Sequence, residues 1–138
     1  MREILFRGRG DTKYNDGVWY YGVPIRDFEG DWQICTNNSK RVVIPETIGQ
    51  YTGLIDKNGK KIFEGDIVHI LGNQDVSDLK SVNYNALIAF LDGGFCAIDG
   101  TIEEHAIRRY APARMGFDLE IIGNIYDNPE LIGGEINA

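Results

Sequence analysis

The stretch 53-GLIDKNGKKIFEGDIV-68 has apolar residues on both sides of Asp56-Lys57-Asn58-Gly59. An Asp side chain can accept hydrogen bonds from main-chain N–H groups two residues on, and Gly adopts a positive φ at little cost, so this tetrapeptide predicts a tight turn. The flanking segments 46–54 and 60–65 read as β-strands. The stretch therefore predicts a β-hairpin, followed after Gly65 by a further strand over 66–71.

Two glycines followed by lysine also raise the question of a phosphate-binding loop. A Walker-type loop needs four residues between its glycines, then Lys and Ser or Thr, then a helix whose N-terminus faces the phosphate. Here five residues separate Gly53 from Gly59, and Lys60 is followed by Lys61. The spacing excludes a phosphate loop. It also excludes an EF-hand, because Gly59 comes too early and no Glu stands at the twelfth position.

The rest of the chain repeats this alternation of β-prone segments and turn residues, with many of its 17 glycines beside Asp or Asn. The segment 82–91 is apolar on both faces after Ala86, which predicts a strand covered on both sides. One helix is predicted over 101–110, where Thr101 and Glu104 fit a capping box. The fold class is therefore all-β with little helix. Strands are predicted over 3–8, 18–25, 32–36, 42–44, 46–54, 60–65, 66–71, 82–91, 95–99 and 117–126.

Composition limits the partners and the compartment. The formal charge of −7 repels nucleic acid and anionic membranes on average. The chain has no run of eighteen apolar residues, and its first ten residues lack the apolar core of a signal peptide. We therefore expect a cytoplasmic protein with Cys35 and Cys96 as reduced, packed thiols.

No arrangement of residues predicts catalysis or a cofactor. Cys35, Cys96, His69 and His105 occur singly, without the spacing of a metal site. Glu103 and Glu104 would point to different faces of the predicted helix and cannot share a proton. We expect no catalytic residue, no metal, no cofactor and no enzymatic activity.

Two surfaces are candidates for binding. Trp19, Tyr20 and Tyr21 follow one another on a predicted strand, so they alternate between its faces and cannot all be buried in one small core. Exposed aromatic surface is typical of protein contacts. The alternative is a nucleic-acid contact through Lys57, Lys60 and Lys61 at the hairpin, although lysines there also protect an edge strand from pairing.

The runs 46-ETIGQYTGLIDKNGKKIFEGDIV-68 and 119-LEIIGNIYDNPELI-132, with the start 1-MREILFRG-8, resemble the YopX family of phage- and prophage-encoded proteins. The resemblance implies a mostly β protein in a bacterial cytoplasm, with an SH3-like barrel in its C-terminal half and no assigned activity. We expect a single YopX-like unit over 1–138. Its parts are an N-terminal β-hairpin and meander region over 1–64 packed on a barrel over 65–126, and a turn and tail over 127–138.

The functional expectation follows from the surfaces and the resemblance together. The primary hypothesis is a non-enzymatic module that binds protein or forms a homo-oligomer through the aromatic strand. The alternative is a nucleic-acid-binding accessory protein that uses the lysine hairpin.

Overall fold

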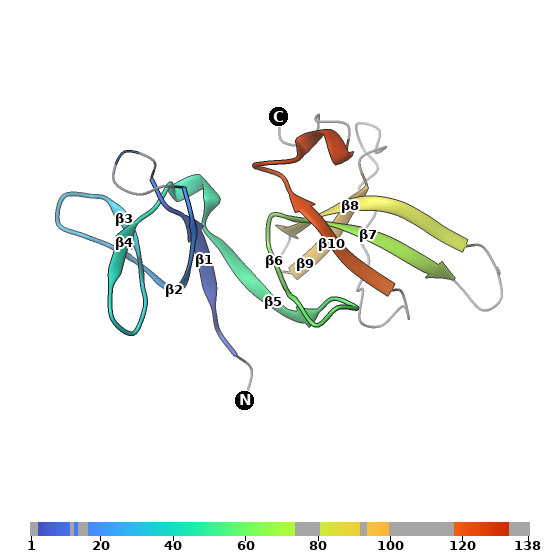
Figure 1. The fold of residues 1–138 in the computed structure, drawn as a ribbon, viewed down its shortest axis with the longest axis horizontal. Helices are drawn as coiled ribbons and strands as arrows, with labels where there is room; N and C mark the ends of the chain where they lie inside the picture. Colours follow the sequence, from blue (N-terminus) through green and yellow to red (C-terminus); the bar gives the residue numbers. More distant parts are fainter. Residues whose placement is uncertain are drawn as a thin grey trace. The chain divides into compact units, whose positions relative to one another are not determined.

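The computed structural model describes residues 3–11, 13, 17–73, 81–91, 94–99 and 118–132. These residues form antiparallel β-strands and two short 3-10 turns (Figure 1). The predicted all-β class is confirmed. The helix predicted over 101–110 lies outside the described residues.

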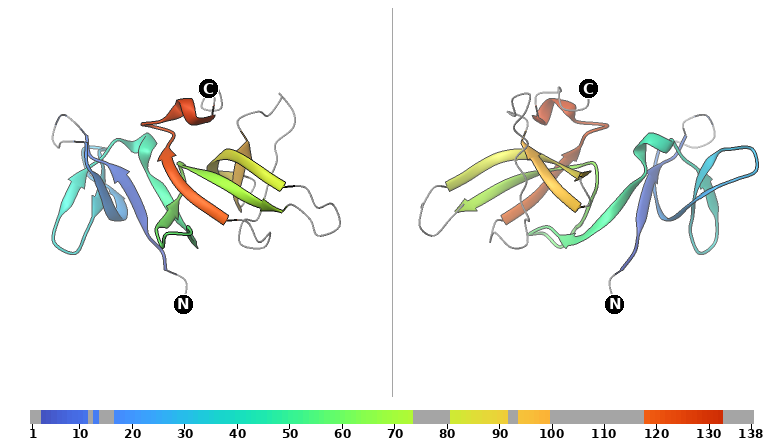
Figure 2. Two further views of the ribbon diagram at one scale, coloured as in Figure 1. Left: turned by 45° about the vertical axis from the view of Figure 1, so that its right-hand side comes forward. Right: turned by 180° about the vertical axis from the view of Figure 1, so that it is seen from behind.

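The strands belong to two sheets. In spatial order, the first sheet contains β4 (Lys40–Val42), β3 (Trp32–Cys35), β2 (Trp19–Arg26), β1 (Phe6–Arg9), β5 (Gly49–Ile55) and β6 (Lys61–Phe63). The second contains β10 (Asp118–Asn124), β7 (Asp66–Asn73), β8 (Ser81–Leu91) and β9 (Gly94–Asp99), which lie side by side in both views of Figure 2. The 3-10 turns are η1 (Pro45–Thr47) and η3 (Pro129–Ile132).

The chain divides into two compact units, Met1–Gly53 and Leu54–Ala138. The sequence placed the boundary after residue 64 instead. The difference arises because the hairpin after Gly53 contributes Ile62 to the core of the second unit. The packing of an N-terminal region on an SH3-like barrel stays a prediction.

Strand β2 alternates between the two faces of the first sheet. Pro24 pairs with Ile34 of β3, and Ile34 is fully buried together with Val43. Cross-strand partners lie on the same face, so every second residue of β2 belongs to this buried side. Tyr21 and Val23 belong to the opposite side.

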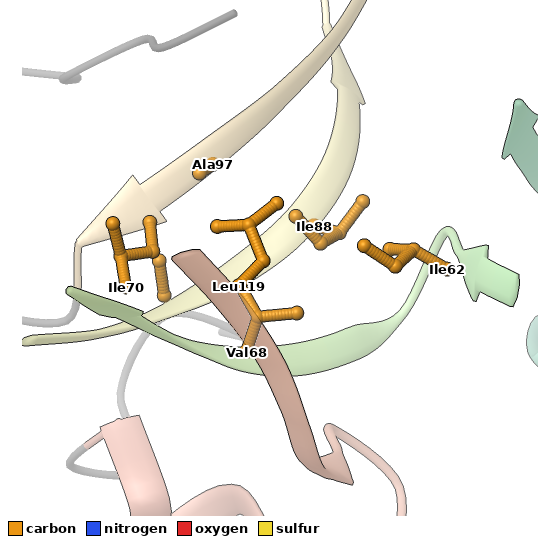
Figure 3. Close-up of a cluster of buried hydrophobic side chains, with 7 residues drawn as sticks. Ile62, Val68, Ile70, Ile88, Ala97 and Leu119 are labelled. Carbon is orange, nitrogen blue, oxygen red and sulfur yellow. The ribbon is translucent and has the colours of Figure 1, made fainter. Parts of the chain in front are cut away.

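The core of the second unit lies between strands of different parts of the chain (Figure 3). Ile62 of β6 and Leu119 of β10 pack with residues of β7, β8 and β9. Burying each large aliphatic side chain contributes about 1.5–3 kcal/mol. The cluster consists of Ile62, Val68, Ile70, Ala86, Ile88, Ala97 and Leu119.

Strand β8 is covered on both faces, as its sequence predicts. Ala86 and Ile88 belong to the first cluster, in which Figure 3 labels Ile88, whereas Leu87 packs with Ile67 and Ile132. Ile132 belongs to η3, so the C-terminal 3-10 turn covers the outer face of β7 and β8.

Two predicted strands begin elsewhere because side chains close the preceding turns. The Thr36 hydroxyl accepts the N–H of Ser39, which ends that turn early and lets Lys40 pair with Cys35. Strand β4 therefore spans 40–42 where the sequence predicted 42–44.

The segment predicted as a strand over 46–54 instead begins with η1. The Thr47 hydroxyl donates to the Ile44 carbonyl and accepts the Arg9 N–H, so the chain turns there. Strand β5 starts only at Gly49.

Gly65 connects three strands of the second unit. Its N–H donates to Ile88 O at 2.8 Å, and its carbonyl accepts the Ile125 N–H at 2.9 Å. These bonds hold its φ at +94°, a region that residues with a Cβ rarely adopt. A Cβ there would also lie 3.1 Å from the Tyr126 ring.

Three glycine-to-alanine variants separate the cost of the positive φ from the cost of the contact with Tyr126. Gly65→Ala should lower the free energy of unfolding by about 1–3 kcal/mol, because it adds both backbone strain and contact with Tyr126. Gly53 has a φ of +89° and no atoms near its missing Cβ, so Gly53→Ala should cost less. Gly94→Ala, with neither feature, should cost least. Urea unfolding followed by circular dichroism measures the order, and equal losses in all three variants would contradict the assignment.

Candidate functional site

The three consecutive aromatic residues of β2 occupy different environments. Tyr20 lies on the side of Ile34, and Trp19 and Tyr21 lie on the opposite side. Tyr21 is 46% exposed and its neighbour Val23 is 57% exposed. The expectation that the three cannot all be buried is confirmed. Their role in binding stays a prediction.

Arginines of the first sheet contact two of these rings. The guanidinium groups of Arg7 and Arg9 lie 4.3 Å and 4.8 Å from the centre of the Trp19 ring. Arg41 lies 5.6 Å from the centre of the Tyr20 ring. Such contacts restrict the rings and stabilise by roughly 0.5–1 kcal/mol at exposed sites such as Arg41, and by about 2 kcal/mol where the cation is desolvated, as for Arg7, which is 6% exposed. Trp19 is thus partly covered by Arg7 and Arg9, and Tyr21 and Val23 are the exposed members of this strand face.

The sequence analysis missed Val23, Arg7 and Arg9 as members of this surface. The alternation of β2 contains the signal for Val23, because it follows Tyr21 at a spacing of two. Arg7 and Arg9 could not be assigned, because their positions depend on the pairing of Arg7 with Tyr21 and Arg9 with Trp19.

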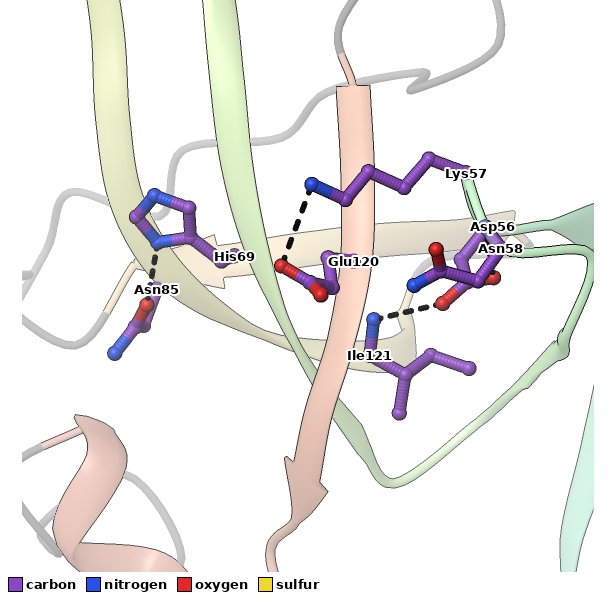
Figure 4. A network of polar contacts seen from close by, with 7 residues as sticks. All are labelled: Asp56, Lys57, Asn58, His69, Asn85, Glu120 and Ile121. Carbon is purple, nitrogen blue, oxygen red and sulfur yellow. Dashed lines mark hydrogen bonds and ion pairs between the residues drawn. The ribbon is translucent and has the colours of Figure 1, made fainter.

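The hairpin turn after β5 is organised by the Asp56 carboxylate, which is 4% exposed. Its Oδ1 accepts the N–H groups of Asn58 and Lys60, both at 2.9 Å. Its Oδ2 accepts the N–H of Ile121 in β10 at 3.1 Å (Figure 4). The same side chain therefore shapes the turn and attaches it to β10.

The lysines of this hairpin are not equivalent. Lys57 donates its N–H to Leu119 O, and its Nζ lies 3.5 Å from Glu120 Oε1 (Figure 4). Lys60 and Lys61 are exposed. Lys57 thus helps to attach the turn to β10. The nucleic-acid contact predicted for the three lysines stays a prediction.

Charge is divided unevenly between the two units. Residues 1–53 carry seven Lys or Arg and seven Asp or Glu, whereas residues 54–138 carry seven against fourteen. The net charge of −7 therefore belongs to the unit that contains the lysine hairpin. That field opposes nucleic-acid phosphates at this location.

A second turn in the first unit repeats the hydrogen bonds of the Asp56 turn. Asp27 Oδ1 accepts the N–H groups of Glu29 and Asp31 at 2.9 Å, as Asp56 Oδ1 does at the same spacings. The N–H of Asp27 donates to Asp31 O, and that of Gly30 donates to Asp27 O. Gly30 and Gly59 have φ values of +90° and +84°. The two turns share the pattern Asp-x-x-Gly-x.

The second residue of the turn distinguishes them. In the second unit this residue is Lys57, which contacts β10 through its main chain and its ammonium group. In the first unit it is Phe28, whose side chain is entirely exposed. A fully exposed phenylalanine on a hydrogen-bonded turn is a marked apolar feature of this surface.

His69 belongs to a polar row across the outer face of the second sheet (Figure 4). Asn85 Nδ2 donates to Leu131 O at 3.0 Å, so its Oδ1 faces His69 Nδ1 at 2.8 Å. Because that oxygen can only accept, Nδ1 carries the proton. The arrangement fastens η3 to the sheet.

The described residues contain no group of three or more His, Cys, Asp or Glu side chains that could hold a metal ion. Cys96 is buried and Cys35 is half-buried, both as free thiols. His105 lies outside the described residues. No helix in the described part of the chain has the length and apolarity needed to cross a bilayer.

Fold and surface together define a class: a mainly antiparallel β protein with two small sheets, organised by Asp-anchored turns. The chain belongs to the YopX family, whose sequence model, described as YopX protein, matches residues 10–133. It is also similar in fold to the solved structure "Crystal structure of protein EF1440 from Enterococcus faecalis". The TM-score is 0.56 and the identity 22%, over 96% of this chain and 99% of that one. None of the curated proteins matches the chain.

The pKa of Asp56 reflects two opposing effects. Burial raises it, but the N–H groups of Ile121, Lys60 and Asn58 and the nearby Lys60 charge outweigh burial, so the pKa lies below its ordinary value. The unfolded carboxyl titrates near pH 3.9. Asp56 therefore stabilises the fold fully above that pH, and its contribution is lost as the pH falls through the lower folded pKa.

Asp56→Asn tests this attachment. The variant should lose about 1–3 kcal/mol of unfolding free energy at neutral pH, because an amide NH₂ would face the Ile121 N–H. The loss should shrink as the pH falls below about 4, where the unfolded wild-type carboxyl takes up a proton, and should vanish below the lower folded pKa, where the folded carboxylate is protonated too. Asp27→Asn is the matched control and should cost less, since among the described residues no N–H of another strand donates to its second oxygen. Equal losses in the two variants would contradict the seating role.

Proposed function

We propose that this YopX-family protein is a non-enzymatic module that binds protein, including a second copy of itself, through the exposed face of β2. The contact centre consists of Tyr21 and Val23, with Trp19 beside them on the same face, whereas Tyr20 lies on the opposite side of the strand. The phage or prophage origin and the bacterial cytoplasm implied by the family resemblance are part of this proposal.

The single observation that supports it is the pair Tyr21 and Val23, which are 46% and 57% exposed at neighbouring positions of one strand face. Aromatic and branched apolar side chains that remain adjacent and exposed favour a binding surface. The neighbouring Trp19 ring is restricted by Arg7 and Arg9, which reduces the entropy lost on binding.

A Tyr21→Ser, Val23→Thr double variant tests the proposal. Wild-type protein should scatter light with a mass above the 15.5 kDa of a monomer at micromolar concentration. The double variant should associate at least about tenfold more weakly, because it removes apolar area from the contact.

Ile55→Thr is the control, because Ile55 is 60% exposed on a different strand and should be dispensable. A wild-type protein that is monomeric at every concentration would rule out self-association. If the wild type and the double variant capture a host protein equally well, the β2 face is ruled out as the binding surface.

A further inference from the structure

The Asp27–Asp31 turn presents an apolar side chain among acidic groups. Phe28 is entirely exposed, and Glu29 and Asp31 beside it are exposed as well. The four turn hydrogen bonds described above fix the main chain, and Arg26 Nε donates to Gly30 O at 3.2 Å. The phenyl ring is therefore displayed on an ordered turn at the end of β2.

The face of the first sheet that carries the exposed Tyr21, Val23 and Lys40 has the opposite charge. Register places Arg7 beside Tyr21, and it places Val23, Cys35 and Lys40 in one row. Arg9 occupies the same face beside Trp19. The cations on this face are Arg7, which is only 6% exposed, Arg9 and Lys40, and strands β1 to β5 contain no Asp or Glu. This face thus combines exposed apolar groups with positive charge.

The related turn of the second unit gives a precedent for docking. There the Asp56 turn lies against β10, with its second residue bonded to a strand carbonyl and paired with Glu120. The Asp27 turn has the same main-chain geometry, but its second residue is apolar and its neighbours are acidic. A surface suited to it offers apolar contact and cations.

We propose that the Asp27–Asp31 turn of one molecule docks on the β2 face of a second copy, near Tyr21, Val23 and Lys40. This inference rests on the proposed function and names its partner. A turn that directly follows β2 cannot fold back onto the middle of the same strand, so the contact is intermolecular. A second copy is favoured over another protein because one chain carries both complementary parts.

Both parts belong to the β2–β3 hairpin, which sets the symmetry. Two hairpins placed antiparallel bring each acidic turn over the other's cationic face. The arrangement is isologous, so every contact occurs twice around a two-fold axis. The two-fold axis passes close to Ile25, which lies between the turn and Tyr21 along β2.

Charge reversal with mixing tests the pairing. Glu29→Lys and Lys40→Glu should each weaken dimerisation about tenfold, since an attraction becomes a repulsion at two symmetric places. An equimolar mixture of the two variants should recover wild-type association as a mixed dimer, because both of its contacts are again between opposite charges. The mixed pair has the total charge of a wild-type pair, so net repulsion is unchanged. Sedimentation velocity at low salt provides the dissociation constants.

Asn58→Lys is the matched control, because Asn58 occupies the position of Glu29 in the other turn and should leave association unchanged. A monomeric wild type, or single variants that dimerise weakly without recovery on mixing, would overturn the pairing. If both reversals leave the dimer intact while the Tyr21→Ser, Val23→Thr variant dissociates, this inference fails and the proposed function stands. If that double variant also stays dimeric, both fail.

Discussion

The Asp56 carboxylate joins two segments that are far apart in the sequence, the turn after β5 and strand β10. One oxygen orders the turn and the other accepts the Ile121 N–H, so the hairpin fits β10 in one register only. With that register fixed, Ile62 and Leu119 enter the same apolar cluster. The Lys57 N–H also occupies Leu119 O, which leaves this part of the β10 edge closed to other strands.

The sequence predicted what short-range chemistry determines. The Asp56–Gly59 turn and the double-sided burial of β8 follow from residues adjacent in the chain, and both predictions are confirmed. The all-β class follows from the same patterns, whereas the family was identified by the resemblance of the runs 46–68 and 119–132 and is shown by the family model. The function of the aromatic strand is not encoded at that range, which is why it stays a proposal.

What the sequence could not predict depends on partners distant in the chain. The Ile121 bond to Asp56, the Thr47 bond to Arg9 N–H and the stacking of Arg7 on Trp19 all require the final register. The division into compact units after Gly53 also depends on distant contacts, and the boundary after residue 64 stays a prediction. The local sequence pattern suggests that the hairpin and β7 belong to different parts of the chain. Ile62 of the hairpin nevertheless packs in the same cluster as Val68 and Ile70 of β7.

The two Asp-x-x-Gly-x turns separate local geometry from role. The two turns have the same main-chain hydrogen bonds. The Asp56 turn is attached to β10 through Glu120 and Ile121, whereas the Asp27 turn exposes Phe28. The division of charge then limits where two copies can meet. Second units carrying all of the net charge repel one another, but salt screens that repulsion over about 8 Å at physiological ionic strength. Contacts confined to the neutral first units can therefore be attractive while the acidic units oppose further growth, which favours a closed dimer over an open assembly.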